Sequence, residues 1–119
     1  MVEPIDSWEK AVAYALTLPD TELSTSYGKP AVKVASNGRA FLYTGHEQQS
    51  SFGVGIDLDT VEILKETDPD TFWQSPHYEG WPAVLIRFAS ADPGRVRSVI
   101  ERSRDWTAAK PPPRPRKRK

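Results

Sequence analysis

Apolar residues follow a helical period near the N-terminus. Between residues 6 and 17 they recur every three or four positions, and they are Trp8, Ala11, Val12, Ala15 and Leu16. Asp6 and Glu9 have the spacing of a capping box, in which two side chains satisfy free backbone amides of the first turn. Pro19 ends the segment. The pattern predicts a helix over 6–17 with its apolar face against a core.

Two further segments carry the same period. A second capping-box pair, Asp59 and Glu62, starts a predicted helix that ends at Asp68-Pro69. Its apolar face consists of Leu58, Val61 and Leu64. In the last helix Asp92 is the expected N-cap, with proline at the first helical position. The inner face of that helix carries Val96, Val99, Ile100 and Ser103, and the residues largely outside it are Arg95, Arg97, Arg102 and Arg104.

The segments between these helices alternate between apolar and polar residues, as half-buried strands do. The residues expected to share a face within each strand are Val32 and Val34, Phe41 and Tyr43, Phe52, Val54 and Ile56, and Val84, Ile86 and Phe88. Residues 22–28 are also prone to form a strand. Asn37-Gly38 predicts a two-residue hairpin turn, because both residue types tolerate a positive φ. Residues 70–75, DTFWQS, are expected to form a short helical turn.

The predicted elements run in the order helix, four strands, helix, one or two strands, helix. This order indicates an α+β fold, in which a single antiparallel sheet is flanked by N-terminal, middle and C-terminal helices. Residues 1–109 are long enough to form one domain with its own core. The core is expected to unite Trp8, Val12, Leu16, Val34, Phe41, Val54, Ile56, Leu64, Leu85 or Ile86, Val99 and Ile100.

Composition narrows the classes of function. The 119-residue chain has no cysteine, which excludes disulfides, thiolate metal ligands and cysteine nucleophiles. No apolar run approaches the roughly 20 residues that cross a bilayer. The first ten residues lack the basic and apolar regions of a signal peptide. We therefore expect a cytoplasmic protein that has no membrane partner and no cofactor.

The net charge of zero is unevenly distributed along the chain. Residues 110–119 hold six of the sixteen basic residues and no acidic one, which leaves residues 1–109 with a net charge of −6. This segment is rich in proline and cannot bury apolar surface, so we predict a disordered tail. A flexible cationic arm binds phosphate groups through counterion release. The alternative is that it only makes the chain more soluble.

Residues 75–81, SPHYEGW, combine groups used in catalysis. A hydrolase would use His77 as the base and Ser75 or Tyr78 as the nucleophile. Neighbouring residues rarely meet in the required geometry, and the chain has no G-x-S-x-G elbow, so we expect no catalytic residue and no enzyme activity. We interpret Tyr78 and Trp81 as rings that cover the edge of the core at a corner of the sheet. The alternative is an aromatic surface that stacks on a base or grips a peptide.

The two histidines of the chain raise the question of a metal site. His46 is followed by Glu47, and His77 lies two residues before Glu79. Neither pair has the helical H-E-x-x-H spacing, and both lie in predicted loops. We therefore expect no metal site.

Short motifs spread over residues 8–106 resemble the YjbR family, also called the MmcQ/YjbR family. In chain order they are Leu18-Pro19, Tyr27–Val34, Asn37-Gly38-Arg39-Ala40-Phe41, Pro76-His77-Tyr78 with Gly80-Trp81, and Arg102-Ser103. The resemblance implies an α+β domain similar to CyaY-like and secretion-chaperone-like folds, and it implies DNA binding. Family members often carry a lysine where this chain has Gly55, so any phosphate contact of that lysine is absent here.

Two hypotheses follow for function. In the first, the chain binds DNA through basic residues of the hairpin and the tail, which are Lys29, Lys33, Arg39, Lys110, Arg114, Arg116, Lys117, Arg118 and Lys119. Arg87 would extend this basic surface if it shared a face with the hairpin residues. In the second, the acidic domain binds another protein or acts as a chaperone-like module.

Overall fold

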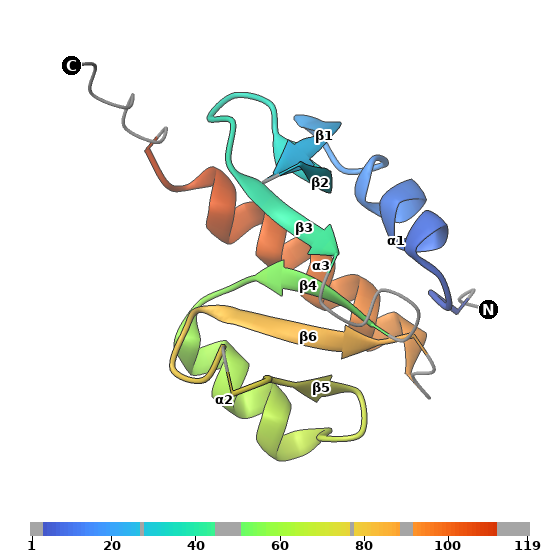
Figure 1. The fold of residues 1–119 in the computed structure, drawn as a ribbon, viewed down its shortest axis with the longest axis vertical. Helices are drawn as coiled ribbons and strands as arrows, with labels where there is room; N and C mark the ends of the chain where they lie inside the picture. The colour runs from blue at the N-terminus through green and yellow to red at the C-terminus, as the bar shows by residue number, and fades with distance from the viewer. Residues whose placement is uncertain (1–3, 27, 45–50, 77, 89–91, 112–119) are drawn as a thin grey trace.

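The computed structural model describes residues 4–26, 28–44, 51–76, 78–88 and 92–111. Within these residues three helices and six strands form an α+β fold, as predicted (Figure 1). The helices are α1 (Trp8–Ala15), α2 (Leu58–Thr67) and α3 (Pro93–Ala108). The strands are β1 (Thr21–Ser26), β2 (Lys29–Val34), β3 (Ala40–Thr44), β4 (Ser51–Gly55), β5 (Phe72–Trp73) and β6 (Ala83–Arg87).

All six strands belong to one antiparallel sheet in the order β1-β2-β3-β4-β6-β5. Helix α3 crosses behind β3 and β4, α2 packs on β5 and β6, and α1 contacts α3 and β3 (Figure 1). Among the described residues, the opposite face of the sheet carries no helix (Figure 1). None of the described helices has the length and apolar content needed to span a membrane.

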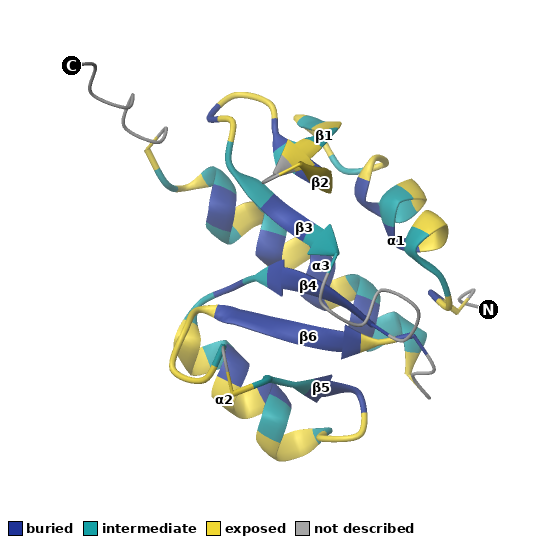
Figure 2. Cartoon of the chain, in the orientation of Figure 1, coloured by how far each residue is buried: buried dark blue, intermediate teal, exposed yellow. Residues whose placement is uncertain are grey.

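One buried cluster unites side chains from all three helices and from β2 to β6. Burial is greatest in the central strands, as Figure 2 shows for β4 and β6. Most of the predicted core is confirmed: the buried members are Val34, Phe41, Val54, Ile56, Leu64, Ile86, Val99 and Ile100, and Trp8 and Val12 pack against them. Because the cluster lies between the helices and one face of the sheet, the opposite face is available for other contacts.

Helix α1 is shorter than the predicted helix over 6–17. Its N-cap is Ser7, whose hydroxyl accepts a hydrogen bond from the backbone amide of Lys10. The predicted cap, Asp6, instead forms an ion pair with the Lys10 side chain, with 3.2 Å between nitrogen and oxygen. The helix ends at Ala15, so Leu16 is the C-cap and is 40% exposed, and its predicted place in the core is wrong.

The start of α2 also differs from the prediction. Its N-cap is Asp57, whose carboxylate accepts hydrogen bonds from the backbone amide and the hydroxyl of Thr60. Asp59 lies in the first turn, so the predicted capping box is wrong, and Leu58 is 40% exposed rather than buried. The predicted N-cap of α3, Asp92, is confirmed.

A β-bulge changes which side chains of β3 face the core. Val32 pairs with Leu42 and Lys33 pairs with Ala40, so Phe41 is the extra residue on its strand. Phe41 and Leu42 are therefore both fully buried in the core cluster. The prediction that Phe41 shares a face with Tyr43 is wrong, because Tyr43 follows Leu42 and lies on the helix-free face.

Two other local predictions are wrong. The β2–β3 hairpin has a five-residue loop, residues 35–39, in which the Gly38 amide donates to the Val34 carbonyl over 2.8 Å. Only Gly38 of this loop has a positive φ, at 71°. The segment predicted as a helical turn contains β5, because Phe72 is buried in the core and pairs with Ile86 of β6.

Candidate nucleic-acid interface

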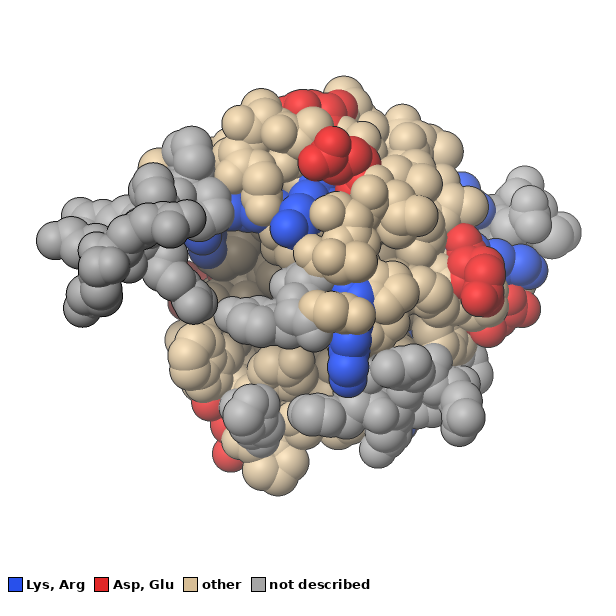
Figure 3. All heavy atoms as spheres, turned by 45° about the horizontal axis from the view of Figure 1, so that its top comes forward, with Lys and Arg blue, Asp and Glu red and all other residues tan. Residues whose placement is uncertain are grey.

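A hollow of about 310 Å³ lies between the β2–β3 hairpin and the C-terminal end of α3. Three of the predicted nucleic-acid contacts line it, and they are Lys33, Arg39 and Lys110. Two aromatic side chains, Tyr43 and Trp106, line it as well. None of the described residues around the hollow is acidic. A hollow bordered by Lys and Arg side chains is visible in Figure 3.

The buried side chain of Asn37 holds the two sides of the hollow together. Its Nδ2 donates to the carbonyl oxygens of Thr107, over 2.8 Å, and Lys110, over 3.1 Å, while its Oδ1 accepts from the Arg39 amide over 3.0 Å. The Arg39 Nε donates to the Pro111 carbonyl over 2.6 Å. These bonds attach the hairpin to the end of α3 and to the first two residues of the predicted tail, so Lys110 and Arg39 are fixed near each other.

Lys110 occupies a partly buried position. Its Nζ lies 3.6 Å from the centroid of the Trp106 ring, which is a cation–π contact. Burial and the positive charge of Arg39 both lower the pKa of Lys110. An anion in the hollow would offset this repulsion between like charges and favour the charged ammonium group. The electrostatics of the hollow therefore suit a negatively charged ligand.

Tyr43 connects the hollow to the helix-free face of the sheet. Burial and the nearby Tyr78 hydroxyl raise the pKa of Tyr43 well above its usual range, so its hydroxyl is neutral at pH 7. Its ring lies over Gly53 on the neighbouring strand, where a Cβ atom would be 2.5 Å from the Tyr43 Cε1. Glycine at this position therefore makes room for the aromatic wall of the hollow.

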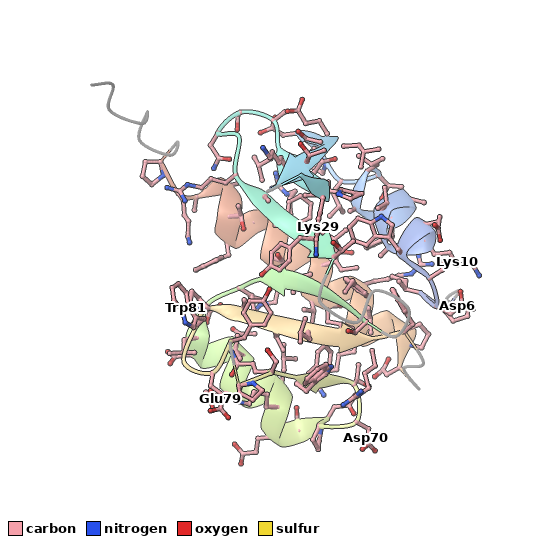
Figure 4. The ribbon with its side chains drawn as sticks, in the orientation of Figure 1. Asp6, Lys10, Lys29, Asp70, Glu79 and Trp81 are labelled. Atoms are coloured by element: carbon pink, nitrogen blue, oxygen red, sulfur yellow. The ribbon has the colours of Figure 1, made fainter. Side chains whose placement is uncertain are left out.

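The remaining predicted basic contacts do not line the hollow. Lys29 and Lys33 share a face of β2 but are four residues apart, which separates their Cα atoms by about 13 Å. The Lys29 side chain is exposed (Figure 4). Arg87 stacks on the Trp73 ring and pairs with Ser51, at the end of β6 away from the hollow. The five basic residues of the tail after Lys110 lie outside the described residues: Arg114, Arg116, Lys117, Arg118 and Lys119.

Gln74 organises the loop that precedes β6. Its Nε2 donates to the carbonyl oxygens of Tyr78, Trp81 and Ala83, over 2.9, 3.0 and 2.7 Å. Its Oε1 accepts from the Lys65 Nζ over 2.8 Å. This role of Gln74 was not predicted from the sequence, because an isolated glutamine carries no motif that marks it. A single side chain therefore links three carbonyls of this loop and the Lys65 side chain of α2.

Trp81 lies at the end of this loop and is 63% exposed. The prediction that its ring covers the core is therefore wrong, whereas Tyr78 is half-buried and lies close to Tyr43. The next residue, Pro82, lines the hollow. Figure 4 shows Trp81 on the same side of the molecule as the C-terminal end of α3. The exposed aromatic residue is thus the chain neighbour of a residue that lines the basic hollow.

The groups considered for catalysis and metal binding do not form a site among the described residues. The Ser75 hydroxyl is buried, and within that part of the chain it has no hydrogen-bond partner. His46, Glu47 and His77 lie outside the described residues. Among the residues that are described, no three His, Cys, Asp or Glu side chains are grouped so that they could hold a metal ion.

The arginines of α3 contact other parts of the protein. Arg95 lies over the Phe72 ring at 5.5 Å and Arg97 over the Tyr14 ring at 4.8 Å. The Arg104 Nη1 donates to the carbonyl of residue 19 over 3.1 Å. These contacts brace α3 against α1, β5 and the loop after α1. Helix α3 therefore does not present these guanidinium groups as a free basic face.

The fold has a counterpart among solved structures. The crystal structure of Deinococcus radiodurans protein DR2400, with its family-model domain DUF419, superimposes with a TM-score of 0.66. The match covers 88% of this chain and 78% of that chain at 16% identity, so it shows a shared fold. DUF419 is the YjbR/MmcQ-type family. No family model and no curated protein matches this chain.

Proposed function

We propose that this chain binds nucleic acid, with the hollow and the tail acting as one cationic surface. The observation that supports this most strongly is the convergence of Lys33, Arg39 and Lys110 on one hollow. Residues 1–109 have a net charge of −6, so phosphate is repelled by most of the domain and attracted to this region. The cationic tail begins at the same place, because Arg39 holds the Pro111 carbonyl.

The chemistry of the hollow suits a polynucleotide backbone. Lysine and arginine side chains neutralise phosphates and release counterions, which makes the affinity depend on salt. The neutral Tyr43 hydroxyl can donate a hydrogen bond to a phosphate or sugar oxygen. Aromatic rings beside cations are the recurring feature of proteins that bind nucleic acid without strict sequence preference.

The shared fold with a DUF419 protein supports a place for this chain in the YjbR/MmcQ-type family. We propose that it is a member without enzyme activity that acts by binding. Gly55, where family members often carry lysine, lines the hollow beside Trp106. Lys110 supplies a cation at the same hollow, and it compensates for the lysine that is missing from β4.

A salt series tests this function. Labelled single-stranded and duplex oligonucleotides would be titrated with the intact chain, with residues 1–111, and with the double variant Lys33→Gln/Arg39→Gln. Each phosphate contact contributes about 0.7 to 0.9 to the slope of log affinity against log salt. Truncation at 111 removes five basic residues, so the slope should become shallower by up to about 4. For the double variant, the slope of log affinity against log salt should become shallower by about 1.5 to 2.

Truncation after Pro111 spares the hydrogen bonds of Lys110 and Pro111, so loss of affinity would not reflect a damaged fold. The matched control is Lys10→Gln, which removes an exposed lysine from α1 outside the hollow. Failure of the intact chain to bind either oligonucleotide at low salt would contradict the proposal. Equal slopes for the intact chain and both altered chains would contradict the proposed surface.

Protein binding is a second candidate function, and the edge strand β1 favours it. In the described part of the sheet β1 pairs only with β2, and its Leu23 is 58% exposed. An exposed strand edge can accept an added strand from a partner. Under this hypothesis Leu23→Lys should abolish capture of a partner and leave oligonucleotide affinity unchanged. Equal capture by Leu23→Lys and the natural chain would argue against this edge.

A further inference from the structure

We infer that the preferred ligand is a single strand of nucleic acid, with one of its bases stacked on Trp81. This inference rests on the nucleic-acid function proposed above and specifies the form of its ligand. Trp81 is the most exposed of the large apolar side chains in the described chain, at 63%. An exposed indole offers a flat apolar face for stacking, and nucleic-acid bases offer a matching π-face.

Hydrogen bonds hold the backbone that carries this ring. Gln74 binds the Trp81 carbonyl, and the Trp81 amide donates to the Tyr78 carbonyl over 2.9 Å. Gly80 takes a φ of 80°, a left-handed conformation that closes the turn before the ring. A backbone held by these bonds loses little conformational entropy when a ligand binds at Trp81, so the cost of stacking on this ring falls mainly on its own side-chain torsions.

The residue that follows Trp81 belongs to the same hollow as the cations. The Pro82 carbonyl accepts a hydrogen bond from the Ile56 amide over 3.1 Å, which fixes the residue after Trp81 at the end of β4. Pro82 lines the hollow together with Lys33, Arg39 and Lys110. A strand whose phosphates occupy the hollow would therefore bring its bases toward Pro82 and its chain neighbour Trp81.

A duplex fits this arrangement poorly. The cations of the hollow are recessed, and Lys110 lies on the Trp106 ring. A duplex presents its phosphates on a rigid convex surface, and it would have to unstack a base at a cost of a few kcal/mol to reach Trp81. Arg95, Arg97 and Arg104 of α3 contact other parts of the fold, so these three do not form a free basic face for the major groove. A single strand has a flexible backbone and accessible bases.

Three probes of equal length separate base stacking from phosphate attraction. They are a labelled thymidine oligonucleotide of about 12 nucleotides, an abasic strand with the same phosphates, and a duplex. The intact chain and the variants Trp81→Ala and Trp81→Phe would be titrated with each at about 50 mM salt. The matched control is Ile63→Ala, which removes an apolar side chain of similar exposure, 55%, from α2.

Trp81→Ala should bind the thymidine strand about 5- to 150-fold more weakly, the equivalent of 1 to 3 kcal/mol for one stacked base. Trp81→Phe should retain most of the affinity, and Ile63→Ala all of it. Binding of the abasic strand and of the duplex should not change with Trp81→Ala. The natural chain should bind the thymidine strand more tightly than the abasic strand and more tightly than the duplex.

Two results overturn the inference alone. One is unchanged affinity of Trp81→Ala for the thymidine strand, and the other is tighter binding of the natural chain to the duplex; in both cases the nucleic-acid function stands. Absence of binding to all three probes overturns the inference together with the proposed function. Tighter binding of an acidic peptide such as polyglutamate than of any oligonucleotide would also overturn both and favour a protein ligand.

Discussion

Replacing Asn37 by alanine should destabilise the fold and open the hollow. The side chain is 8% exposed and makes three hydrogen bonds that join the hairpin to the end of α3. Each such bond contributes about 0.5 to 1.5 kcal/mol net, and a buried carbonyl left without a donor costs about 1 to 3 kcal/mol. The Lys110 carbonyl is only partly buried and can turn to water. We therefore expect Asn37→Ala to lower the free energy of unfolding by about 2 to 3 kcal/mol.

Equilibrium unfolding in urea measures this change. With a typical slope of about 1 to 3 kcal/mol per molar urea, the midpoint should fall by about 0.7 to 3 M. Ser36→Ala is the matched control, because Ser36 is the exposed neighbour of Asn37 in the same hairpin loop. Its free energy of unfolding should change by less than about 0.5 kcal/mol.

The same variant links stability to function. Without Asn37 the Lys110 carbonyl is no longer tied to the hairpin, so the salt slope for oligonucleotides should become shallower while the sequence of basic residues is unchanged. An Asn37→Ala chain that unfolds at the same urea concentration as the Ser36→Ala control would refute the argument that this side chain holds the hollow together.

Three other predictions concern local structure. Asp57→Ala should lower the free energy of unfolding by about 1 kcal/mol, because α2 loses its N-cap. Asp59→Ala should lower it by less than about 0.5 kcal/mol. A larger loss for Asp59→Ala than for Asp57→Ala in urea unfolding would support the Asp59–Glu62 capping box instead. Gly53→Ala should lower the free energy of unfolding by about 1 to 3 kcal/mol, since the added Cβ would overlap the Tyr43 ring. Unchanged stability would show that the ring moves freely. Because burial and the nearby Tyr78 hydroxyl raise the pKa of Tyr43, the folded state favours the neutral phenol, and stability should fall as pH rises above about 10. Tyr43→Phe should flatten this alkaline slope in unfolding experiments, and equal slopes would contradict the assignment.

The fold class followed from hydrophobic periodicity, because period and order of elements are properties of the sequence itself. Alternation in β2, β4 and β6 identified strands whose buried faces the structure confirms. The bulge at Phe41 could not be inferred in the same way, since it depends on the register between β2 and β3. The N-caps of α1 and α2 were predicted wrongly for a different reason. Each helix start offers two residues that can serve as a cap, Asp6 or Ser7 and Asp57 or Asp59, and local spacing does not choose between them.

Individual residues of the candidate site were predicted from the sequence, but their arrangement in space was not. Lys33, Arg39 and Lys110 were all predicted as nucleic-acid contacts, but their convergence depends on Asn37, which bonds to Thr107, 70 residues away along the chain. Sequence marked Asn37 as a turn residue, which hid its bridging role. The burial of Trp81 was predicted wrongly, because the apolar character of a ring near a strand end does not reveal whether the ring is buried.

The position of the bound ligand tests the central claim most directly. The chain has four tryptophans: Trp106 lines the hollow, Trp81 precedes Pro82, which also lines it, and Trp8 and Trp73 lie in α1 and β5. Each indole N–H gives a separate nuclear magnetic resonance signal, which tryptophan-to-phenylalanine variants would assign. Addition of a single-stranded oligonucleotide at low salt should shift the signals of Trp106 and Trp81 and leave those of Trp8 and Trp73 in place. Shifts confined to Trp8 and Trp73, or no shift at all, would contradict the account.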